Sequence, residues 1–180
     1  MKIGIITSTV REGRQGLNVA KWVKDLADKR NDGTSYEIVD LKTYNLPIFG
    51  TNPTEEQGKA IKDFSAKINE LDGFVFVTAE YNHAPTGVLK NALDYLKPEF
   101  NNKAASFIGY GGVGGARAIE QLRLVLAELG VATTQRNVNL LLAVDFVNFS
   151  EFAPKDHQLP MVEELLTQLN NWSKALKTLR

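Results

Sequence analysis

The sequence predicts an α/β domain in which a doubly wound parallel sheet of five strands, in the order 2-1-3-4-5, carries helices on both faces. Short runs rich in β-branched and apolar residues alternate with stretches of helical period, and no internal repeat or flexible linker interrupts them. The run GFVFVTA at 73–79 is apolar on both faces, as a central strand of a parallel sheet must be. Such an alternation requires right-handed crossovers, and the doubly wound order is the simplest arrangement that satisfies them.

Each element can be justified in chain order. The strands are expected at 2–7 (KIGIIT), 36–41 (YEIVDL), 73–79, 105–110 (ASFIGY) and within 132–142. Thr54 and Gln57 have the spacing of a capping box, so one helix is expected to begin there. Apolar side chains at helical spacing predict five helices, and these stripes are Val19, Trp22, Val23, Leu26 and Ala27; Ile61, Phe64, Ile68 and Leu71; Leu89, Ala92, Leu93 and Leu96; Ile119, Leu122, Leu126 and Leu129; Val162, Leu165, Leu166, Leu169 and Leu176.

Composition favours a single domain over residues 1–180 and excludes several classes of partner. The chain is 43% hydrophobic, which is enough for one core without disulfides or structural metals. Lys plus Arg (21) equal Asp plus Glu (21), so no overall charge attracts nucleic acid or a membrane surface. Cysteine is absent, which removes thiolate chemistry. The first residues enter a strand directly, without the features of a signal peptide, so a cytoplasmic protein with no membrane span is expected.

Three loops are expected to carry the function. In doubly wound sheets, ligands bind outside the carboxyl ends of the strands, at the point where the winding direction reverses. Here that point lies between the first and third strands. The loops that meet there are 8–18, 79–87 and 109–115.

The first loop, STVREGRQGLN, has the features of a site for a phosphate monoester. Helix-start amides attract an anion, Ser8 and Thr9 offer hydroxyl groups, and Arg11 or Arg14 can neutralise the charge. The alternative is an ordinary capped turn with two solvated arginines. The spacing of a nucleotide triphosphate loop, GxxxxGK[ST], is absent.

The third loop, GYGGVGG, contains GxGxxG at Gly109, Gly111 and Gly114. A dinucleotide fingerprint is a poor interpretation, because the motif follows the fourth strand and no acidic residue ends a strand about 20 residues further on. The glycines indicate a tight turn that a flat or bulky group can approach closely. A merely flexible loop is the alternative.

The second loop offers ring faces and backbone groups to a flat heteroaromatic ligand. Tyr81 and His83 can stack, while the backbone around Glu80 to His83 presents donors and acceptors. His83 and His157 are the only histidines, so no metal site is expected. Ser8 with His83 lacks the context of a nucleophile elbow, which argues against a hydrolytic triad.

Together the three loops resemble the NADPH-dependent FMN reductases of flavodoxin-like fold, a family that includes quinone, azo-dye and chromate reductases. STVREGR is similar to the family's GSxRxGR or GSxRxGS loop, AEYNHAPTGVLKNALDYL to PEYNxxxPxxLKNALDWL, and GYGGVGGARAIEQLR to its glycine-rich third loop. The departures are Ser8 for Gly, Arg14 for the Ser of one subgroup, Ala79 for Pro and Thr86 for Pro.

The resemblance implies a set of FMN-binding residues. Thr9 and Arg11 would hold the phosphate, assisted by the residues from Arg14 to Leu17, while the second and third loops would border the isoalloxazine ring. The full set is Thr9, Arg11, Arg14, Gln15, Gly16, Leu17, Glu80, Tyr81, Asn82, His83, Tyr110, Gly111 and Gly112.

The implied activity is an oxidoreductase that passes hydride from NADPH or NADH through FMN to a small acceptor: a quinone, free flavin, azo compound or metal oxyanion. No side chain is required as an acid or base, and His83 is expected to shape the acceptor site. A flavodoxin-type electron carrier and a non-catalytic flavin or nucleotide sensor are the alternatives. The resemblance also implies a homodimer or a dimer-built tetramer. Loop 44–50 contains the apolar Leu46, Ile48 and Phe49, which could form an interface; the alternative is that these residues simply cover the sheet.

Overall fold

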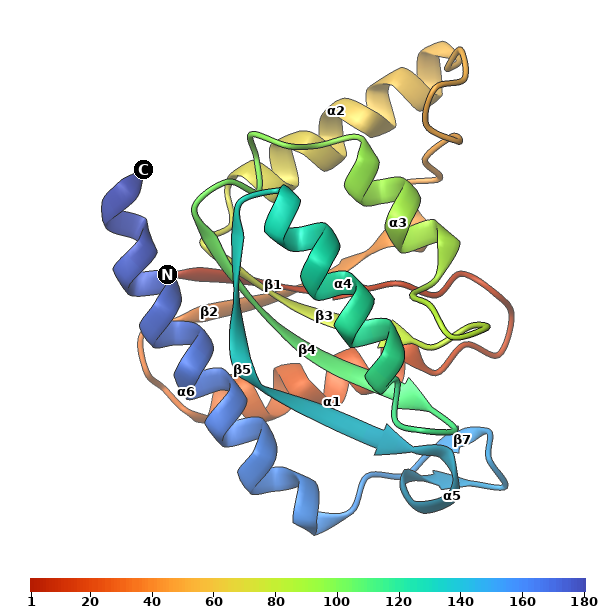
Figure 1. The fold of residues 1–180 in the computed structure, drawn as a ribbon, viewed down its shortest axis with the longest axis vertical. Coiled ribbons are helices and arrows are strands. Elements are labelled where there is room, and N and C mark those ends of the chain that lie inside the picture. The colour runs from red at the N-terminus through yellow and green to blue at the C-terminus, as the bar shows by residue number, and fades with distance from the viewer.

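A computed structural model describes residues 1–180 and confirms the predicted sheet. Its five strands are all parallel, in the order β2-β1-β3-β4-β5. Figure 1 shows the strands running side by side with helices in front and behind. The elements are β1 (Lys2–Thr7), α1 (Gly16–Lys29), β2 (Ser35–Asp40), a 3₁₀ turn (Leu41–Thr43), α2 (Glu55–Asn69), β3 (Gly73–Ala79), α3 (Gly87–Asp94), β4 (Lys103–Gly111), α4 (Ala116–Glu128), β5 (Val131–Leu141), α5 (Leu142–Asp145), β6 (Phe146–Val147), β7 (Glu151–Phe152), a 3₁₀ turn (Asp156–Gln158), α6 (Leu159–Leu176) and a 3₁₀ turn (Lys177–Leu179).

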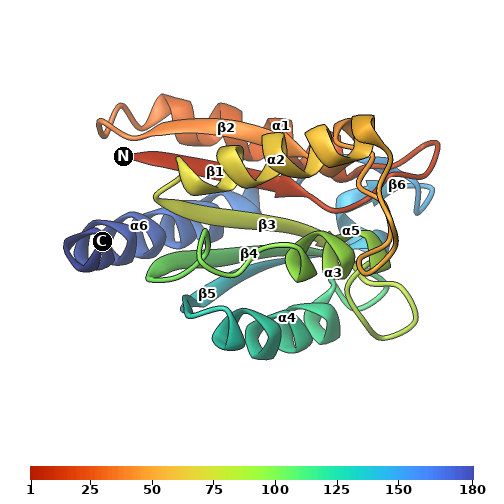
Figure 2. The same cartoon turned by 90° about the horizontal axis from the view of Figure 1, so that it is seen from above.

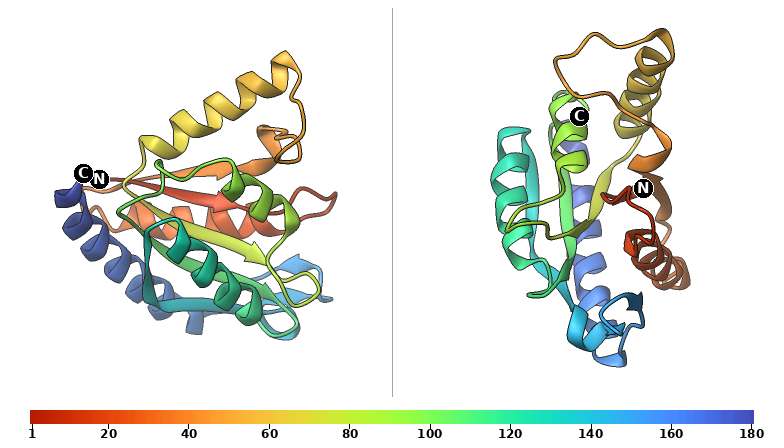
Figure 3. Two further views of the ribbon diagram at one scale, coloured as in Figure 1. Left: turned by 45° about the horizontal axis from the view of Figure 1, so that its top comes forward. Right: turned by 90° about the vertical axis from the view of Figure 1, so that its right-hand side faces the viewer.

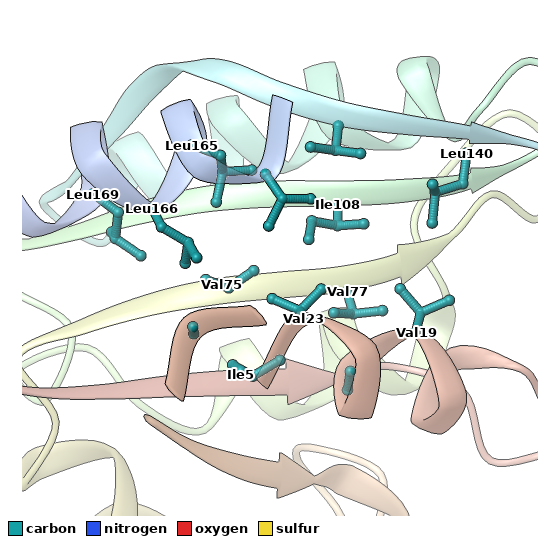
Figure 4. Packing of buried hydrophobic residues seen from close by; sticks show 14 of the residues in the cluster. Ile5, Val19, Val23, Val75, Val77, Ile108, Leu140, Leu165, Leu166 and Leu169 are labelled. Atoms are coloured by element: carbon teal, nitrogen blue, oxygen red, sulfur yellow. The ribbon is translucent and has the colours of Figure 1, made fainter. Parts of the chain in front are cut away.

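The sheet separates two apolar cores. On one face, α1 and α6 pack on the sheet and form a cluster of 20 buried residues. Figure 4 shows part of this cluster, with Val19 and Val23 of α1 and Leu165 of α6 directed toward the strands. On the other face, α2, α3 and α4 enclose a cluster of 19 buried residues. Figure 2 shows the two helical layers on opposite sides of the sheet. All seven residues of β3 are buried, which confirms the prediction of a doubly covered central strand.

Local signals explain where the helices begin. The predicted capping box is present at α2, where the Thr54 hydroxyl accepts from the backbone of Gln57 and the Gln57 side chain accepts from the backbone of Thr54. Helix α3 is capped by the Thr86 hydroxyl, which accepts from Leu89 N–H. Helix α1 begins differently, because its N-cap residue, Gln15, makes no side-chain capping bond. This difference bears directly on the functional site.

A small hairpin after the main sheet was not expected from the sequence. Strands β6 and β7 pair antiparallel around a turn in which Asn148 and Phe149 both have left-handed backbone angles, with φ of 50° and 58°. Phe152 packs edge-on against Trp22 of α1, and its N–H donates to the Gln15 side chain. The hairpin therefore lies beside the start of α1, at the carboxyl edge of the sheet. This edge faces the viewer in the right panel of Figure 3.

Candidate functional site

Hydrogen bonds join the first two predicted loops at the carboxyl edge of the sheet. The Thr86 hydroxyl donates to the Ser8 carbonyl over 2.6 Å, and the Ser8 hydroxyl donates to Val77 O over 3.0 Å. Arg11 Nε donates to the Tyr81 hydroxyl over 3.0 Å. The structure thus brings the loops that follow β1 and β3 into direct contact.

The start of α1 has the geometry of an anion site. Its first N–H groups have no side-chain cap, and its first turn carries no acidic residue. Gly16 is buried, and a Cβ built there would lie 2.7 Å from Thr9 Oγ1 and 2.9 Å from the Tyr110 hydroxyl oxygen. Only glycine leaves this cradle open at the helix start. The cradle fits a phosphate group such as that of FMN.

The two arginines of the first loop have different roles. Arg14 forms a bidentate ion pair with Asp40 at the end of β2, with contacts of 2.6 and 2.5 Å, and also donates to Thr9 O over 2.8 Å. Both side chains of the pair are only 13% exposed. Arg11 is exposed, and only its Nε is engaged within the chain. Arg11 is therefore the arginine with donors free for a ligand.

The pKa of Asp40 reflects this arrangement. Burial alone would raise it, but hydrogen bonds from Arg14, from Lys42 N–H and from the Thr7 hydroxyl hold the pKa of the carboxyl below its usual value. The Asp40 hydrogen bond in turn raises the pKa of Arg14. The pair remains ionised at neutral pH and fixes the shape of the first loop.

Removal of either arginine separates these roles. Arg11→Ala should weaken FMN binding about tenfold or more and leave riboflavin binding nearly unchanged, because a charge-assisted hydrogen bond is worth roughly 1.5 to 3 kcal/mol and only FMN carries a phosphate. Arg14→Ala should weaken both flavins alike and lower the stability of the fold. Fluorescence titration with the two flavins measures both effects, and equal losses for FMN and riboflavin in Arg11→Ala would contradict the assignment.

The second loop is a tight turn at the rim of the site. Tyr81 and Ala84 exchange backbone hydrogen bonds of 3.0 and 3.1 Å, and Asn82 and His83 between them have left-handed φ angles of 49° and 72°. Gln121 of α4 donates to His83 O over 2.6 Å. The Tyr81, Asn82 and His83 side chains are exposed, so both predicted ring faces are available to a ligand.

The Glu80 side chain points away from this exposed rim. It is only 4% exposed and forms an ion pair with Arg117 at the start of α4. Its Oε2 also accepts from Arg117 N–H over 3.1 Å. A ligand at the site would therefore contact Glu80 chiefly through its backbone.

Close packing requires glycine at several positions of the third loop. A Cβ at Gly109 would lie 2.6 Å from Gly114 O, and one at Gly114 would lie 2.7 Å from Asn139 Cβ. The Asn139 side chain holds the loop by donating to Gly114 O over 2.9 Å. These contacts support the interpretation of the motif as a tight turn rather than as a flexible loop.

Tyr110 lies beneath the site, while Gly112 is exposed at its rim and Gly111 is buried. The Tyr110 hydroxyl lies 3.2 Å from Thr9 Oγ1, and its ring packs 6.0 Å from that of Phe146. Burial raises the pKa of Tyr110 to about 12, so the hydroxyl keeps its proton at neutral pH. Tyr110 and Thr9 together close the floor of the cradle at the start of α1.

Four residues of the site were missed by the sequence analysis. Asp40 and Arg117 partner the motif residues Arg14 and Glu80, Gln121 holds the second loop, and Phe152 binds Gln15 through its backbone. A usable signal existed only for Asp40. Asp40 ends the strand beside the first strand, and parallel neighbours end at the same edge of a sheet, so its carboxylate must lie near the first loop.

A cavity of about 650 Å³ lies beside the first loop, which contributes Val10 to its lining. None of the predicted FMN-binding residues lines it. Its walls come from the 41–48 segment and the start of α3, and the lining residues are Val10, Leu41, Lys42, Asn45, Leu46, Ile48, Gly87, Val88 and Asn91.

No cluster of three or more His, Asp or Glu side chains suited to a metal ion occurs. None of the helices combines the length and the apolar character that a membrane span requires.

The doubly wound sheet in the order 2-1-3-4-5 places the chain in the class of flavodoxin-like folds. The sequence profile of the NADPH-dependent FMN reductases matches residues 1–145. The chain belongs to this family.

Individual relatives agree with this assignment. An NAD(P)H-dependent FMN reductase of Schizosaccharomyces pombe is 40% identical over 133 residues, which cover 69% of this chain and 64% of the relative. An NADPH azoreductase of a Bacillus species is 26% identical over 183 residues, covering 100% and 97% of the two chains. The solved structure of FerB, a flavoenzyme NAD(P)H:(acceptor) oxidoreductase from Paracoccus denitrificans, has the same fold, with a TM-score of 0.74, 18% identity and 97% coverage of both chains.

Proposed function

We propose that the protein is an FMN-dependent NAD(P)H oxidoreductase that passes hydride to a small acceptor. The observation that carries the proposal is the convergence of an uncapped helix start, the free donors of Arg11 and two polar loops at one edge of the sheet, in a chain of the FMN reductase family. Neither a flavodoxin-type carrier nor a sensor accounts as well for membership of a reductase family.

The protein's part in the reaction is to bind and orient. The amides of Gly16 and Leu17 and the Arg11 guanidinium hold the phosphate, while backbone groups at 80–83 and 110–112 border the ring system. FMN supplies the chemistry of accepting and releasing hydride. Buried Thr9 and Tyr110 keep water from the floor of the site. Alignment of two flat rings is the main requirement for hydride transfer, so no side chain needs to act as an obligatory acid or base.

The proposed acceptors are quinones, free flavins, azo compounds and metal oxyanions. A full-length relative is named for azo-compound reduction, which supports the azo class. The exposed Tyr81 and His83 rings suit a flat acceptor. NADPH and NADH are both proposed as donors, and a cytoplasmic location, where these donors are available, is part of the proposal.

One assay tests the function against its alternatives. The purified protein loaded with FMN should oxidise NADPH or NADH with multiple turnovers when a quinone is supplied. Binding of FMN without turnover would support a sensor, and one-electron exchange with protein partners without NAD(P)H oxidation would support a carrier. The absence of saturable FMN binding by fluorescence quenching would remove the basis of the proposal.

His83 should influence the acceptor more than the donor. His83→Ala is expected to change KM and acceptor preference while flavin reduction by NAD(P)H keeps its rate, because the exposed imidazole borders the site without a partner for its ring in the chain. Stopped-flow bleaching of the flavin measures the reductive step. A loss of several hundredfold in that step, with FMN still bound, would show that His83 takes part in hydride transfer.

We also propose that the chain assembles as a homodimer or a dimer-built tetramer. Ile48 is 74% and Phe49 55% exposed, an unusual exposure for such large apolar side chains. The loop is nevertheless held in place, since Asn91 accepts from Phe49 N–H and donates to Pro47 O, both over 2.8 Å. A rigid apolar projection of this kind suits an interface. Sedimentation should give at least twice the chain mass at micromolar concentration, and Ile48→Asp should shift it toward a single chain.

A further inference from the structure

The ion pair between Glu80 and Arg117 links the end of β3 to the start of α4. The N-cap of α4, Gly115, has no side chain to cap the helix. Glu80 supplies the missing cap from another loop, because its Oε2 accepts from Arg117 N–H over 3.1 Å while Oε1 contacts the Arg117 guanidinium. The carboxylate is held at the positive end of the helix dipole as well as by the arginine.

Glu80, the first of the second-loop residues proposed to border the flavin ring, also contacts the third loop. Its N–H donates to Tyr110 O over 3.1 Å, so its backbone extends the pairing of β3 with β4. A Cβ at Gly111 would lie 3.4 Å from Glu80 Cβ, which places the third loop directly against this residue. A ring bound between the 80–83 and 110–112 backbones would lie against the backbone of Glu80, and the Glu80 carboxylate would lie on the protein side of that backbone, paired with Arg117.

A nearly buried carboxylate is an unexpected choice at a site for an anionic cofactor. Burial costs a carboxylate free energy unless a partner compensates, and here the compensation comes from Arg117. Hydrogen bonds from the Arg117 side chain and backbone overcome the effect of burial and lower the pKa of Glu80. Glu80 is therefore a fixed negative charge at neutral pH, and Arg117, which is 46% exposed, is its counter-charge.

We propose that Glu80 and Arg117 are a positioning pair that sets the reduction potential of the bound flavin. This inference rests on the proposed function. When NAD(P)H gives up hydride, two electrons and one proton reach the flavin, which carries one more negative charge until a second proton arrives from water. The Glu80 carboxylate opposes that added charge and Arg117 favours it, so the two residues act on the potential in opposite directions.

The test compares both halves of the pair with a control on the same helix. Glu80→Gln keeps the size and an acceptor oxygen but removes the charge, while Arg117→Met keeps the stem and removes the counter-charge. Glu128→Gln is the control, because Glu128 pairs with Lys97 at the other end of α4 and its side chain is 80% exposed. The potential of bound FMN is measured by equilibrium reduction against a dye of known potential, and circular dichroism checks the fold.

Glu80→Gln should increase the preference of the protein for reduced over oxidised FMN about tenfold. For a two-electron couple, this change raises the reduction potential of bound FMN by about 30 mV. Arg117→Met should shift the potential by a similar amount downward, Arg117→Lys should restore it, and Glu128→Gln should leave it unchanged. Shifts of the same sign in Glu80→Gln and Arg117→Met, or no shift in either, would overturn the proposal. If Glu80→Gln does not fold, the proposal is tested by the two arginine variants: the potential of bound FMN should fall in Arg117→Met and return to its original value in Arg117→Lys. Failure of the unmodified protein to bind FMN would instead contradict the proposed function.

Discussion

Gly109→Ala is expected to displace the third loop, abolish measurable FMN binding and lower the free energy of unfolding by about 2 to 3 kcal/mol. The new Cβ would lie 2.6 Å from Gly114 O, 2.9 Å from Ile119 Cδ1 and 3.1 Å from Gly115 Cα. Two of these three neighbours are backbone atoms, which cannot move aside as a flexible side chain would. Urea unfolding and FMN titration measure the two effects.

Gly112 provides a matched control within the same loop. A Cβ there would meet no atom within 4 Å, and its backbone is not left-handed, so Gly112→Ala should leave stability nearly unchanged. An equal loss of stability in both variants would mean that the loop tolerates no alanine at all. If Gly109→Ala changed neither the free energy of unfolding nor FMN binding, the loop would be flexible, which is the alternative that the sequence left open.

Asp40→Asn is expected to cost about 2 to 4 kcal/mol of stability at neutral pH, because it leaves the half-buried Arg14 charge without its partner. Loss of the pair also frees the first loop, so FMN and riboflavin should both bind more weakly. Asp63→Asn is the control, since Asp63 pairs with Lys59 on the exposed face of α2 and its loss should cost no more than about 0.5 kcal/mol. Equal costs for the two variants would contradict the role of the Asp40 pair.

The cost of Asp40→Asn should depend on pH in a defined direction. The pKa of Asp40 is lowered in the folded state, so its contribution to stability is fully present above the unfolded pKa of about 3.9 and is lost as the pH falls through the lower folded-state pKa. The difference between the two proteins should therefore narrow as unfolding is measured at progressively more acid pH. A difference that stays constant from pH 7 into this acid range would show that the charge of Asp40 is not what stabilises the loop.

The sequence predicted the fold well where signals are local. The doubly apolar β3 and the Thr54 capping box depend on neighbouring residues alone, and both are confirmed. The sequence placed the fifth strand only within 132–142, and the polar run TTQRNVN interrupts the apolar pattern there. The structure explains it: the pairing of β4 with β5 shifts register there, and Arg123 of α4 donates to Thr134 O over 2.7 Å and thereby satisfies the irregular backbone.

The β6–β7 hairpin was missed for a related reason. Its turn places Asn148 and Phe149 in left-handed conformations, where the sequence rules expect Asn-Gly. The strands it joins have only two residues each, too few for a pattern to be visible.

Within the site, the sequence identified the loops but could not assign each side chain. Arg11 and Arg14 differ only in their partners, and Asp40 lies 26 residues beyond Arg14 in the chain. The same holds for Glu80 and Arg117, which are 37 residues apart. Which member of a motif faces a ligand and which faces the protein is decided by such long-range contacts.

The two cores on either side of the sheet are completed at different moments of synthesis. Every buried member of the cluster under α2, α3 and α4 lies at or before Val131. The opposite cluster needs Val162, Leu165, Leu166 and Leu169 of α6. A nascent chain can therefore finish one face of the sheet while the other, including Ile3, Val75 and Ile108, still lacks its cover. Without α6, these side chains would form an exposed apolar surface of the kind that makes partly folded chains prone to aggregation.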